Sequence, residues 1–526
     1  MPPAFLLPAG LDALALSERL EPLGRAREDG ARTQRYTLLD SFDWRLHHAG
    51  WRLEAVGGPR PLLRLRPLGG GRPLATLRAP APRRASDLPP GPLRERLAGV
   101  LDPRALLPLV VADVTVTRLC LATRGRPPVT LSLESAVVGP PGAAPSLPLR
   151  PALVVPAGPR AAALRALVCS WADSEPAPDD AVATLLEPLG RVPRDYSGKI
   201  RVPLEPALPA RTAARAVLLH LLGTLEANLP GVHEDLDPEF LHDFRVAVRR
   251  TRSALGQIKG VLPPATAAHF TRAFARLQEL TGPARDLDVY VLELPALARL
   301  LPPRARRSLG PLARLLERRR REAYGRLAAA LDEPAFAALL ARWRAFLMAP
   351  TPARPRGAPN ALRPAGAVAA ERIGRLLRRA LREGSAIDAA SPAADLHELR
   401  KTCKKLRYLV EFFQSLLAPE AAAAAIESLK GLQDVLGRHQ DLQVQADALL
   451  GYARELARER KAPPPAYLAV GMLVERLRDE QRAARLAFAE RFADFSRKSN
   501  RRNWRRLFAV AAAAPAAPAD QEPEHG

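Results

Sequence analysis

The pattern of apolar and polar positions changes near residue 210. Before it, short apolar runs bounded by Gly and Pro predict strands, among them Trp51–Val56, Leu62–Leu68 and Val129–Val138. After it, Ala, Leu, Arg and Glu recur with a period of about 3.6 residues, which predicts packed helices. Further elements predicted in the first part are a helix at Leu11–Leu23, strands at Arg35–Leu39, Pro73–Arg78 and Val114–Ala122, and helix within 159–190.

Proline marks two junctions. Arg191–Pro209 is irregular and proline-bearing, which predicts a domain boundary. Prolines 350, 352, 355, 359 and 364 cannot all belong to a helix and predict a linker. The predicted organisation is an α+β domain at 1–195, an all-α domain at 205–508 (halves 205–348 and 366–508 around the linker 349–365), and a disordered tail at 509–526.

The two helical halves share a motif at a constant offset of 155 residues. Leu241–Arg252 aligns with Leu396–Arg407. A common offset held over about 45 positions indicates an internal duplication and predicts a pseudo-two-fold helical domain. The same offset relates Leu277–Glu279 to Leu432–Asp434, Gly282 to Gly437, and Asp286 to Asp441.

Glycines in the repeat predict helix ends. Gly282-Pro283 and Gly437 stand where a helix would stop, with an aspartate near the start of the next helix. This favours a structural role over a metal site for Gln278, Asp286, Gln433 and Asp441.

On a helical wheel each copy of the motif gathers cations on one face. At about 100° per residue the cations lie opposite an apolar face, along a stripe about 15 Å long. The first copy places His242, Arg245, Arg249 and Arg252 opposite Phe244, Val248 and Leu255. The second places His397, Arg400, Lys404 and Arg407 opposite Leu399, Cys403 and Val410, and the further cations are Arg250, Lys401 and Lys405.

These stripes have two interpretations. A charged helix face is usually solvated. Here neither stripe shows the acidic residues at i,i+4 that accompany a solvated face, and the like charges repel one another. The second interpretation is therefore an anion shared by both copies, to which His242 and His397 donate hydrogen bonds. No HxH or HExxH pattern supports a metal at these histidines.

The charge balance also points to an anionic partner. Lys and Arg number 79 and Asp and Glu 55, a net charge of +24, which attracts nucleic acid, an anionic surface or a phosphate chain. Residues 201–526 hold 53 basic and 36 acidic side chains, against 26 and 19 in 1–200, so the excess lies mainly in the helical part.

Several classes of protein are not expected. Cys120, Cys169 and Cys403 are too far apart in sequence for a disulfide framework or a CxxC site. No run of about 18 apolar residues predicts a membrane span. Met1–Leu16 lacks the basic start of a signal peptide, so we expect a soluble cytoplasmic protein.

At the repeated motifs the chain resembles the CHAD domain, the conserved-histidine α-helical family, over about residues 205–500. The resemblance rests on His242–Arg252, Arg285–Val289 and His397–Tyr408. It implies two pseudo-symmetric helical bundles, no cofactor, and a basic central surface that binds inorganic polyphosphate. The binding residues so implied are His242, Arg245, Arg249, Arg250, Arg252, His397, Arg400, Lys401, Lys404, Lys405 and Arg407.

The first domain resembles a CYTH domain, the triphosphate tunnel fold, which implies an antiparallel barrel or tunnel. The resemblance rests on Tyr36–Ser41, Arg45-Leu46 and Ala49–Trp51. Active members open with an ExExK strand whose glutamates hold a divalent metal, but Pro2–Pro8 carries neither carboxylate nor lysine. We therefore expect no metal unless the domain is active, and anion binding in a tunnel lined by Arg64, Arg66, Arg78, Arg118 and Glu134.

Three functions are open at this point. The first is a non-enzymatic polyphosphate-binding protein, associated with polyphosphate granules. The second is an inorganic triphosphatase that acts through the first domain. The third is non-specific nucleic-acid binding, for which the basic faces lack interleaved aromatic residues.

Overall fold

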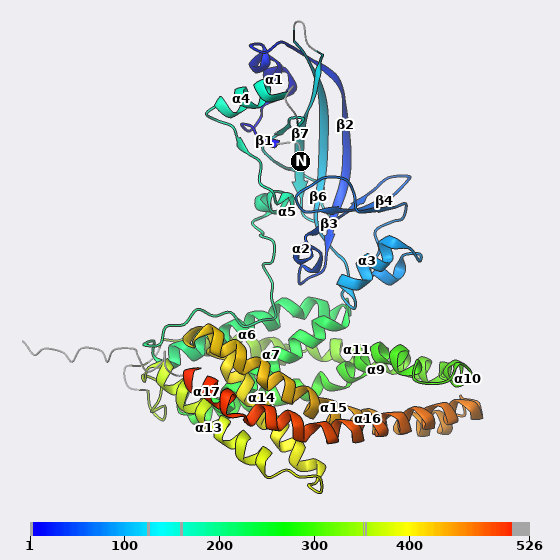
Figure 1. Cartoon of the computed structure of the whole chain (residues 1–526), viewed down its shortest axis with the longest axis vertical. Helices are drawn as coiled ribbons and strands as arrows, with labels where there is room; N and C mark the ends of the chain where they lie inside the picture. The colour runs from blue at the N-terminus through cyan, green and yellow to red at the C-terminus, as the bar shows by residue number, and fades with distance from the viewer. Residues whose placement is uncertain (1–3, 124–126, 158–160, 351, 353–354, 508–526) are drawn as a thin grey trace, which may run out of the picture. The chain divides into compact units, whose positions relative to one another are not determined.

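The structure is a computed structural model that describes residues 4–123, 127–157, 161–350, 352 and 355–507 (Figure 1). The chain divides into two compact units, Met1–Gly198 and Lys199–Gly526. The tail predicted at 509–526 lies outside the described residues. Among the described helices, none combines the length and the apolar composition that crossing a membrane requires.

The first unit is built on an antiparallel sheet, which confirms the predicted α+β class. Its pairing order is β10-β1-β9-β7-β6-β2-β3-β4-β5, and β8 pairs with β7. The strands are β1 (Ala4–Leu6), β2 (Arg25–Asp40), β3 (Trp51–Val56), β4 (Leu62–Pro67), β5 (Ala75–Leu77), β6 (Leu107–Ala122), β7 (Val129–Gly139), β8 (Leu147–Pro148), β9 (Ala152–Val154) and β10 (Glu175–Pro176).

Short helices cover the sheet and enclose three apolar clusters. Leu16 and Leu20 of α1 pack with Leu119 and Leu131 of the long strands. Leu97 of α3 belongs to a second cluster, formed with strands β3 and β4. The helices of this unit are α1 (Ala13–Leu20), α2 (Arg45–His48), α3 (Pro92–Leu101), α4 (Ala162–Ser170) and α5 (Ala181–Leu186), with 3-10 turns η1 (Ala85–Asp87) and η3 (Glu187–Leu189).

Two predictions for this unit were incomplete. Helix at 159–190 is interrupted, because β10 separates α4 from α5 at Pro176, which cannot continue a helix. The strand predicted at Arg35–Leu39 is only the end of β2, whose first ten residues are mostly exposed and polar and so show no apolar run.

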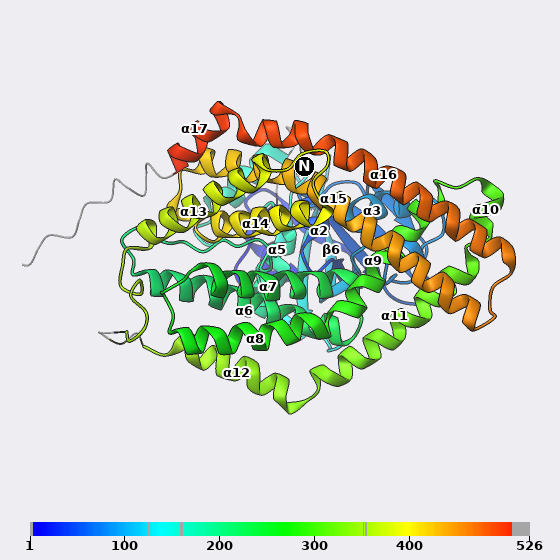
Figure 2. The same cartoon turned by 90° about the horizontal axis from the view of Figure 1, so that it is seen from below.

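The second unit is all helical in its secondary structure. Figure 2 shows α6 to α8 and α12 on one side, and α13, α14 and α17 on the other. The helices are α6 (Ala210–His233), α7 (Pro238–Gln257), α8 (Pro264–Leu280), α9 (Gly282–Ala298), α10 (Pro303–Arg307), α11 (Gly310–Leu331), α12 (Pro334–Met348), α13 (Ala365–Ser385), α14 (Ala393–Phe412), α15 (Pro419–Arg458), α16 (Pro464–Ser496) and α17 (Lys498–Leu507), with the 3-10 turn η4 (Gln414–Leu416).

The repeat in the sequence is also a repeat in the helices. Helices α13, α14 and α15 begin 155 residues after α6, α7 and α8, at positions 365, 393 and 419 against 210, 238 and 264. Helices α7 and α14 also have the same length, 20 residues.

Backbone hydrogen bonds relate the two halves by a pseudo-two-fold axis. Ala210 N donates to Arg363 O at 2.8 Å, and the equivalent Ala365 N donates to Leu208 O at 2.7 Å. Arg363 and Ala365 are equivalent to Leu208 and Ala210, so exchanging the two copies converts the first hydrogen bond into the second. Pro209 and Pro364, equivalent to one another, form the antiparallel bridge between these segments.

The predicted helix end at Gly437 was wrong. Helix α15 continues through this position, whereas its counterparts α8 and α9 are separated at Thr281. The first copy has Pro283 after its glycine, which removes a helical N–H donor, and the second copy has Arg438. A glycine alone costs a helix only about 1 kcal/mol, so packing holds α15 straight through it.

Candidate anion-binding site

Helices α7 and α14 carry the two basic stripes and pack against each other. Each helix buries its apolar face fully, with Phe244 and Val248 in α7 and Leu399 and Cys403 in α14 at 0% exposure. The stripes are not solvent-facing, because most of their side chains are buried or half-buried. We name the cations that α7 and α14 bring together the axial cluster: Arg245, Arg249, Arg250, Arg252, Arg400, Lys404 and Arg407.

Arg249 and Lys404 are equivalent residues that lie within electrostatic reach of each other. Burial, together with the charges of Arg400, Arg249 and Arg407, lowers the pKa of Lys404 to about 8, against the attraction of Asp441. The buried Nε of Arg249 has no hydrogen-bond acceptor. Within the described part of the chain, neither side chain has a carboxylate partner. The two cations therefore repel each other, and no described carboxylate forms an ion pair with either.

Arg245 is the most buried cation of the cluster, at 8% exposure. Its Nη1 donates to Gln278 O and to Thr281 Oγ1, both at 2.7 Å, at the end of α8. Burial lowers the pKa of Arg245 to about 10, and the neighbouring Arg249 contributes to the shift. The side chain is thus fixed by neutral acceptors, and the nearby Asp286 offsets part of its charge.

Other members of the cluster have polar partners on α8 and α15. Arg252 Nη1 donates to Gln278 Oε1 at 2.5 Å. Arg400 Nη2 pairs with Asp441 Oδ1 at 2.9 Å, although the aspartate side chain is 61% exposed. Gln278 and Asp441, for which the sequence favoured a structural role, therefore orient cations of the cluster.

The prediction that the stripes lack acidic partners was wrong at one end of the cluster. Glu411 Oε2 accepts from Arg250 Nη2 at 2.7 Å, which links α14 to α7. Glu411 Oε1 also lies 3.2 Å from Arg407 Nε, at the i,i+4 spacing. Tyr408 lies beneath both guanidinium groups, with 5.9 Å from each to the ring centroid. The i,i+4 spacing of Arg407 and Glu411 was visible in the sequence; the contact with Arg250 needed the fold.

The remaining predicted residues differ in their placement. His242 is half-buried in α7, and His397 Nδ1 lies 3.0 Å from Gln440 Oε1. Lys405 is half-buried on α14. Lys401 is exposed and pairs with Glu398 one turn before it, so the structure does not bring it into the axial cluster.

Comparison with known proteins identifies the family of this helical region. The family model of the CHAD domain matches residues 216–450, which include both stripes. This part of the chain is a CHAD domain.

Two solved structures are similar to the chain. The crystal structure of the CHAD domain from the plant Ricinus communis has 26% sequence identity, a TM-score of 0.46, and coverage of 56% of this chain and 96% of that one. The structure of PptA from Streptomyces chartreusis has 22% identity, a TM-score of 0.41, and coverage of 54% and 99%. Comparison with curated proteins gives no match.

Outside the CHAD domain, three half-buried arginines of the first unit have a carboxylate or amide partner. Glu54, only 5% exposed, lies 3.1 Å from Arg52 and 3.2 Å from Arg66. Arg64 Nη1 donates to Gln34 Oε1 at 2.8 Å. Burial beside this group raises the pKa of Tyr36 to about 12. Arg78, Arg118 and Glu134, also predicted to line a tunnel, are exposed.

The first unit does not fit the metal that a CYTH domain would hold. Strand β1 consists of Ala4, Phe5 and Leu6, whose side chains have no ligand oxygen. No group of three or more His, Cys, Asp or Glu side chains in the described parts of the chain could hold a metal ion. The resemblance to CYTH stays a prediction with which the antiparallel sheet is compatible.

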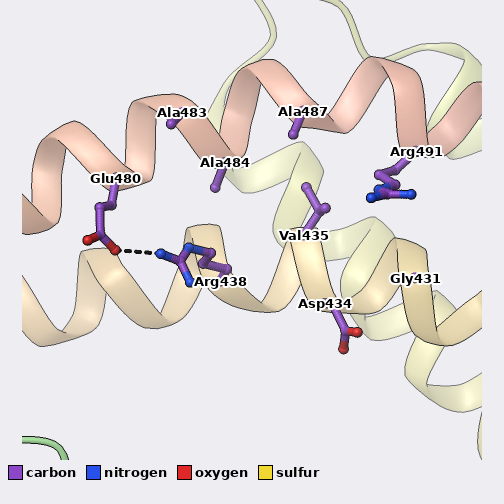
Figure 3. Close-up of a pocket in the computed structure, with 9 residues that line it drawn as sticks. All are labelled: Gly431, Asp434, Val435, Arg438, Glu480, Ala483, Ala484, Ala487 and Arg491. Atoms are coloured by element: carbon purple, nitrogen blue, oxygen red, sulfur yellow. Dashed lines mark hydrogen bonds and ion pairs between the residues drawn. The ribbon is translucent and has the colours of Figure 1, made fainter. Parts of the chain in front are cut away.

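A pocket of about 480 Å³ lies between α15 and α16, outside the axial cluster (Figure 3). Its wall on α16 includes Ala483, Ala484 and Ala487. At one end Arg438 Nη2 pairs with Glu480 Oε2 at 2.6 Å. This arginine has a carboxylate partner, unlike Arg249 and Lys404.

Proposed function

We propose that the CHAD domain binds inorganic polyphosphate and that the protein acts as a binder, not as an enzyme. The observation that supports this most strongly is that Arg249 and Lys404 lie within electrostatic reach of each other. Two half-buried cations without carboxylate partners repel each other, and the cost of holding them together falls when an anion lies between them. An arginine offers two N–H groups to phosphate oxygens, and a lysine adds a mobile point charge.

The extent of the cluster favours a chain of phosphates over a single one. The stripe from His242 to Arg252 is about 15 Å long, and the pseudo-two-fold axis adds the equivalent stripe of α14. Successive phosphates of a repeating anion can therefore contact successive cations. Binding of such a polymer weakens with salt, because each contact releases condensed counterions.

The same cluster is poorly suited to nucleic acid. Tyr408 is an aromatic residue in contact with its cations, and it is 8% exposed beneath Arg250 and Arg407. A base could not stack on it without displacing those arginines. Single-stranded nucleic acid relies on exposed aromatic platforms for much of its affinity. Polyphosphate needs none.

The test is a titration of the full chain with polyphosphates of defined length at several salt concentrations. The double variant Arg249→Ala/Lys404→Ala removes both unpartnered cations, and we expect affinity to fall at least about tenfold. The matched control is Arg375→Ala/Arg379→Ala, which removes two exposed arginines paired with Glu371 and Glu383 on α13. Equal affinities of the two variants would contradict the site, and a wild-type chain that does not bind would contradict the function.

The non-enzymatic part of the proposal has its own assay. We expect no phosphate release from tripolyphosphate with Mg²⁺ or Mn²⁺, because β1 lacks the carboxylates that would hold either ion. Release above the buffer blank would support a triphosphatase instead. We further propose that the protein is cytoplasmic and associates with polyphosphate granules; loss of granule association in the Arg249→Ala/Lys404→Ala variant is the expected result.

A further inference from the structure

Helix α17, outside the part matched by the CHAD family model, has one buried and one cationic face. Asn500, Trp504 and Leu507 are buried at 9%, 1% and 0% exposure. Asn500 Nδ2 donates to Ser428 Oγ at 2.6 Å, and the Trp504 ring contacts Phe495 edge-on. These contacts fix the helix on α15 and α16. The opposite face consists of exposed cations, the α17 patch: Lys498, Arg501, Arg502, Arg505 and Arg506.

The geometry of an α-helix gathers the patch on one side. Measured from Asn500 at 100° per residue, the five cations lie between about 100° and about 240°, and the buried residues lie within about 40° of zero. Arg501 with Arg505 and Arg502 with Arg506 are like-charged i,i+4 pairs, which destabilise a helix by about 0.2–0.5 kcal/mol each. Lys498 and Arg501 also lie in the first turn, where the helix dipole disfavours cations.

Several exposed arginines of the neighbouring helix α16 have acidic partners, unlike the cations of the α17 patch. On α16, Arg478 and Arg482 pair with Glu475 and Asp479. At the end of α16, Asp494 pairs with Arg497 and lies 3.9 Å from Arg491. Within the described residues, no carboxylate pairs with any cation of the α17 patch. The α17 patch therefore gathers five exposed cations on one helix face without a carboxylate partner among the described residues.

We propose that the α17 patch is a second contact surface for inorganic polyphosphate, used by chains long enough to occupy the axial cluster and α17 together. This rests on the proposed function. The aromatic and apolar residues of α17 are engaged: Trp504 cannot stack on a base, and the buried Trp504 and Leu507 cannot enter a lipid layer. The exposed face offers charge alone, which suits a polymer of closely spaced phosphates. Two linked contacts raise affinity through effective concentration without any new contact chemistry.

The test compares tripolyphosphate with long-chain polyphosphate on the full chain. The variant Arg501→Gln/Arg502→Gln/Arg505→Gln/Arg506→Gln should lose about tenfold or more in affinity for the long chain. The salt slope of log Kd should fall by about 3. Affinity for tripolyphosphate should stay within about twofold, because the axial cluster is intact. Replacing the same four residues by Lys keeps the charge and should keep long-chain affinity.

The matched control removes four arginines that have carboxylate partners: Arg375, Arg379, Arg478 and Arg482, each to Gln. It has the same net charge as the α17 variant. Equal long-chain affinities of the two variants would overturn the proposal. So would α17-dependent binding of single-stranded RNA or anionic vesicles in preference to polyphosphate. The proposed function fails by a different result, namely a wild-type chain that binds neither polyphosphate.

Discussion

Arg249 and Lys404 occupy equivalent positions in the two copies of the repeat, and the charge of Arg249 helps to lower the pKa of Lys404. The pseudo-two-fold arrangement of the copies thus places Arg249 of the first copy near Lys404 of the second. A surface arginine and lysine would separate in solvent, but these two belong to helices that pack against each other. Helix packing therefore keeps the two like charges close together, and an anion bound between them would lower their repulsion.

The lowered pKa of Lys404, about 8, predicts a pH dependence of polyphosphate binding. A bound anion favours the charged amine, so binding takes up a proton wherever the free lysine is neutral. Affinity should therefore be constant below about pH 7 and fall by several-fold between about pH 7 and about pH 9. Lys404→Arg keeps its charge over this range and should flatten the profile; parallel profiles for the two proteins would show that another group titrates.

Glu411 pairs with two cations of the cluster to which we assign polyphosphate binding. Its carboxylate lies 2.7 Å from Arg250 and 3.2 Å from Arg407, and all three side chains are mostly buried. Glu411→Gln should raise polyphosphate affinity about two- to tenfold, because both arginines become available. The same change should lower the free energy of unfolding by about 1–3 kcal/mol.

The control for this prediction is Glu398→Gln, which removes an exposed carboxylate paired with Lys401 on the same helix. It changes the net charge equally, and we expect affinity within about twofold of wild type and no measurable loss of stability. If Glu411→Gln binds no more tightly than Glu398→Gln, the carboxylate does not occupy the ligand's place.

The helical architecture was largely readable from the sequence, and the partners of its charges were not. Periodicity and the constant offset predicted the duplicated helices because both features are local or repeated along the chain. The link from Arg250 to Glu411 joins residues 161 apart and depends on how α7 packs on α14. The helix end predicted at Gly437 was wrong for a similar reason. Packing keeps α15 helical through this position, although a glycine alone favours a helix end.

The internal repeat did not predict the α17 patch. Asn500 and Trp504 lie beyond the aligned motifs, and an Arg-rich segment near a proline-rich tail is typical of disordered sequence. Only the burial of Trp504 turns the segment into an ordered helix with a defined cationic face. The segment lies within the helical half predicted at 366–508, but the spacing of Trp504 and Leu507 is too short to predict which face is buried.

Two helical glycines should respond oppositely to alanine. A Cβ at Gly437 would lie 3.8 Å from Arg400 Nε, an ordinary contact, so Gly437→Ala should stabilise the protein by about 0.5–1 kcal/mol. A Cβ at Gly384 would overlap the ring of Phe492. Gly384→Ala should therefore cost about 1–3 kcal/mol. Chemical denaturation measures both, and a loss of stability in Gly437→Ala would show that the glycine at this position serves the site and not the helix.

Asp288, in one of the motifs that carry the resemblance to CHAD, has a structural role away from the ligand. Its carboxylate is buried, with Oδ1 accepting from Arg320 Nε and Oδ2 from Tyr324 Oη, both at 2.7 Å. Asp288→Ala should lower the free energy of unfolding by about 1–3 kcal/mol, because Tyr324 loses its acceptor and Arg320 keeps Asp235 as an ion-pair partner. Tyr324→Phe keeps the ring under Arg320 and should cost about 1 kcal/mol.

Polyphosphate affinity separates this role from a binding role. Asp288, Arg320 and Tyr324 join α9 to α11, and none belongs to the axial cluster. Tyr324→Phe should therefore bind polyphosphate within about twofold of wild type at a temperature where it is folded. A tenfold loss of affinity in the folded variant would mean that α9 and α11 transmit their packing to the cluster, through Arg285 and Asp286 beside Arg245.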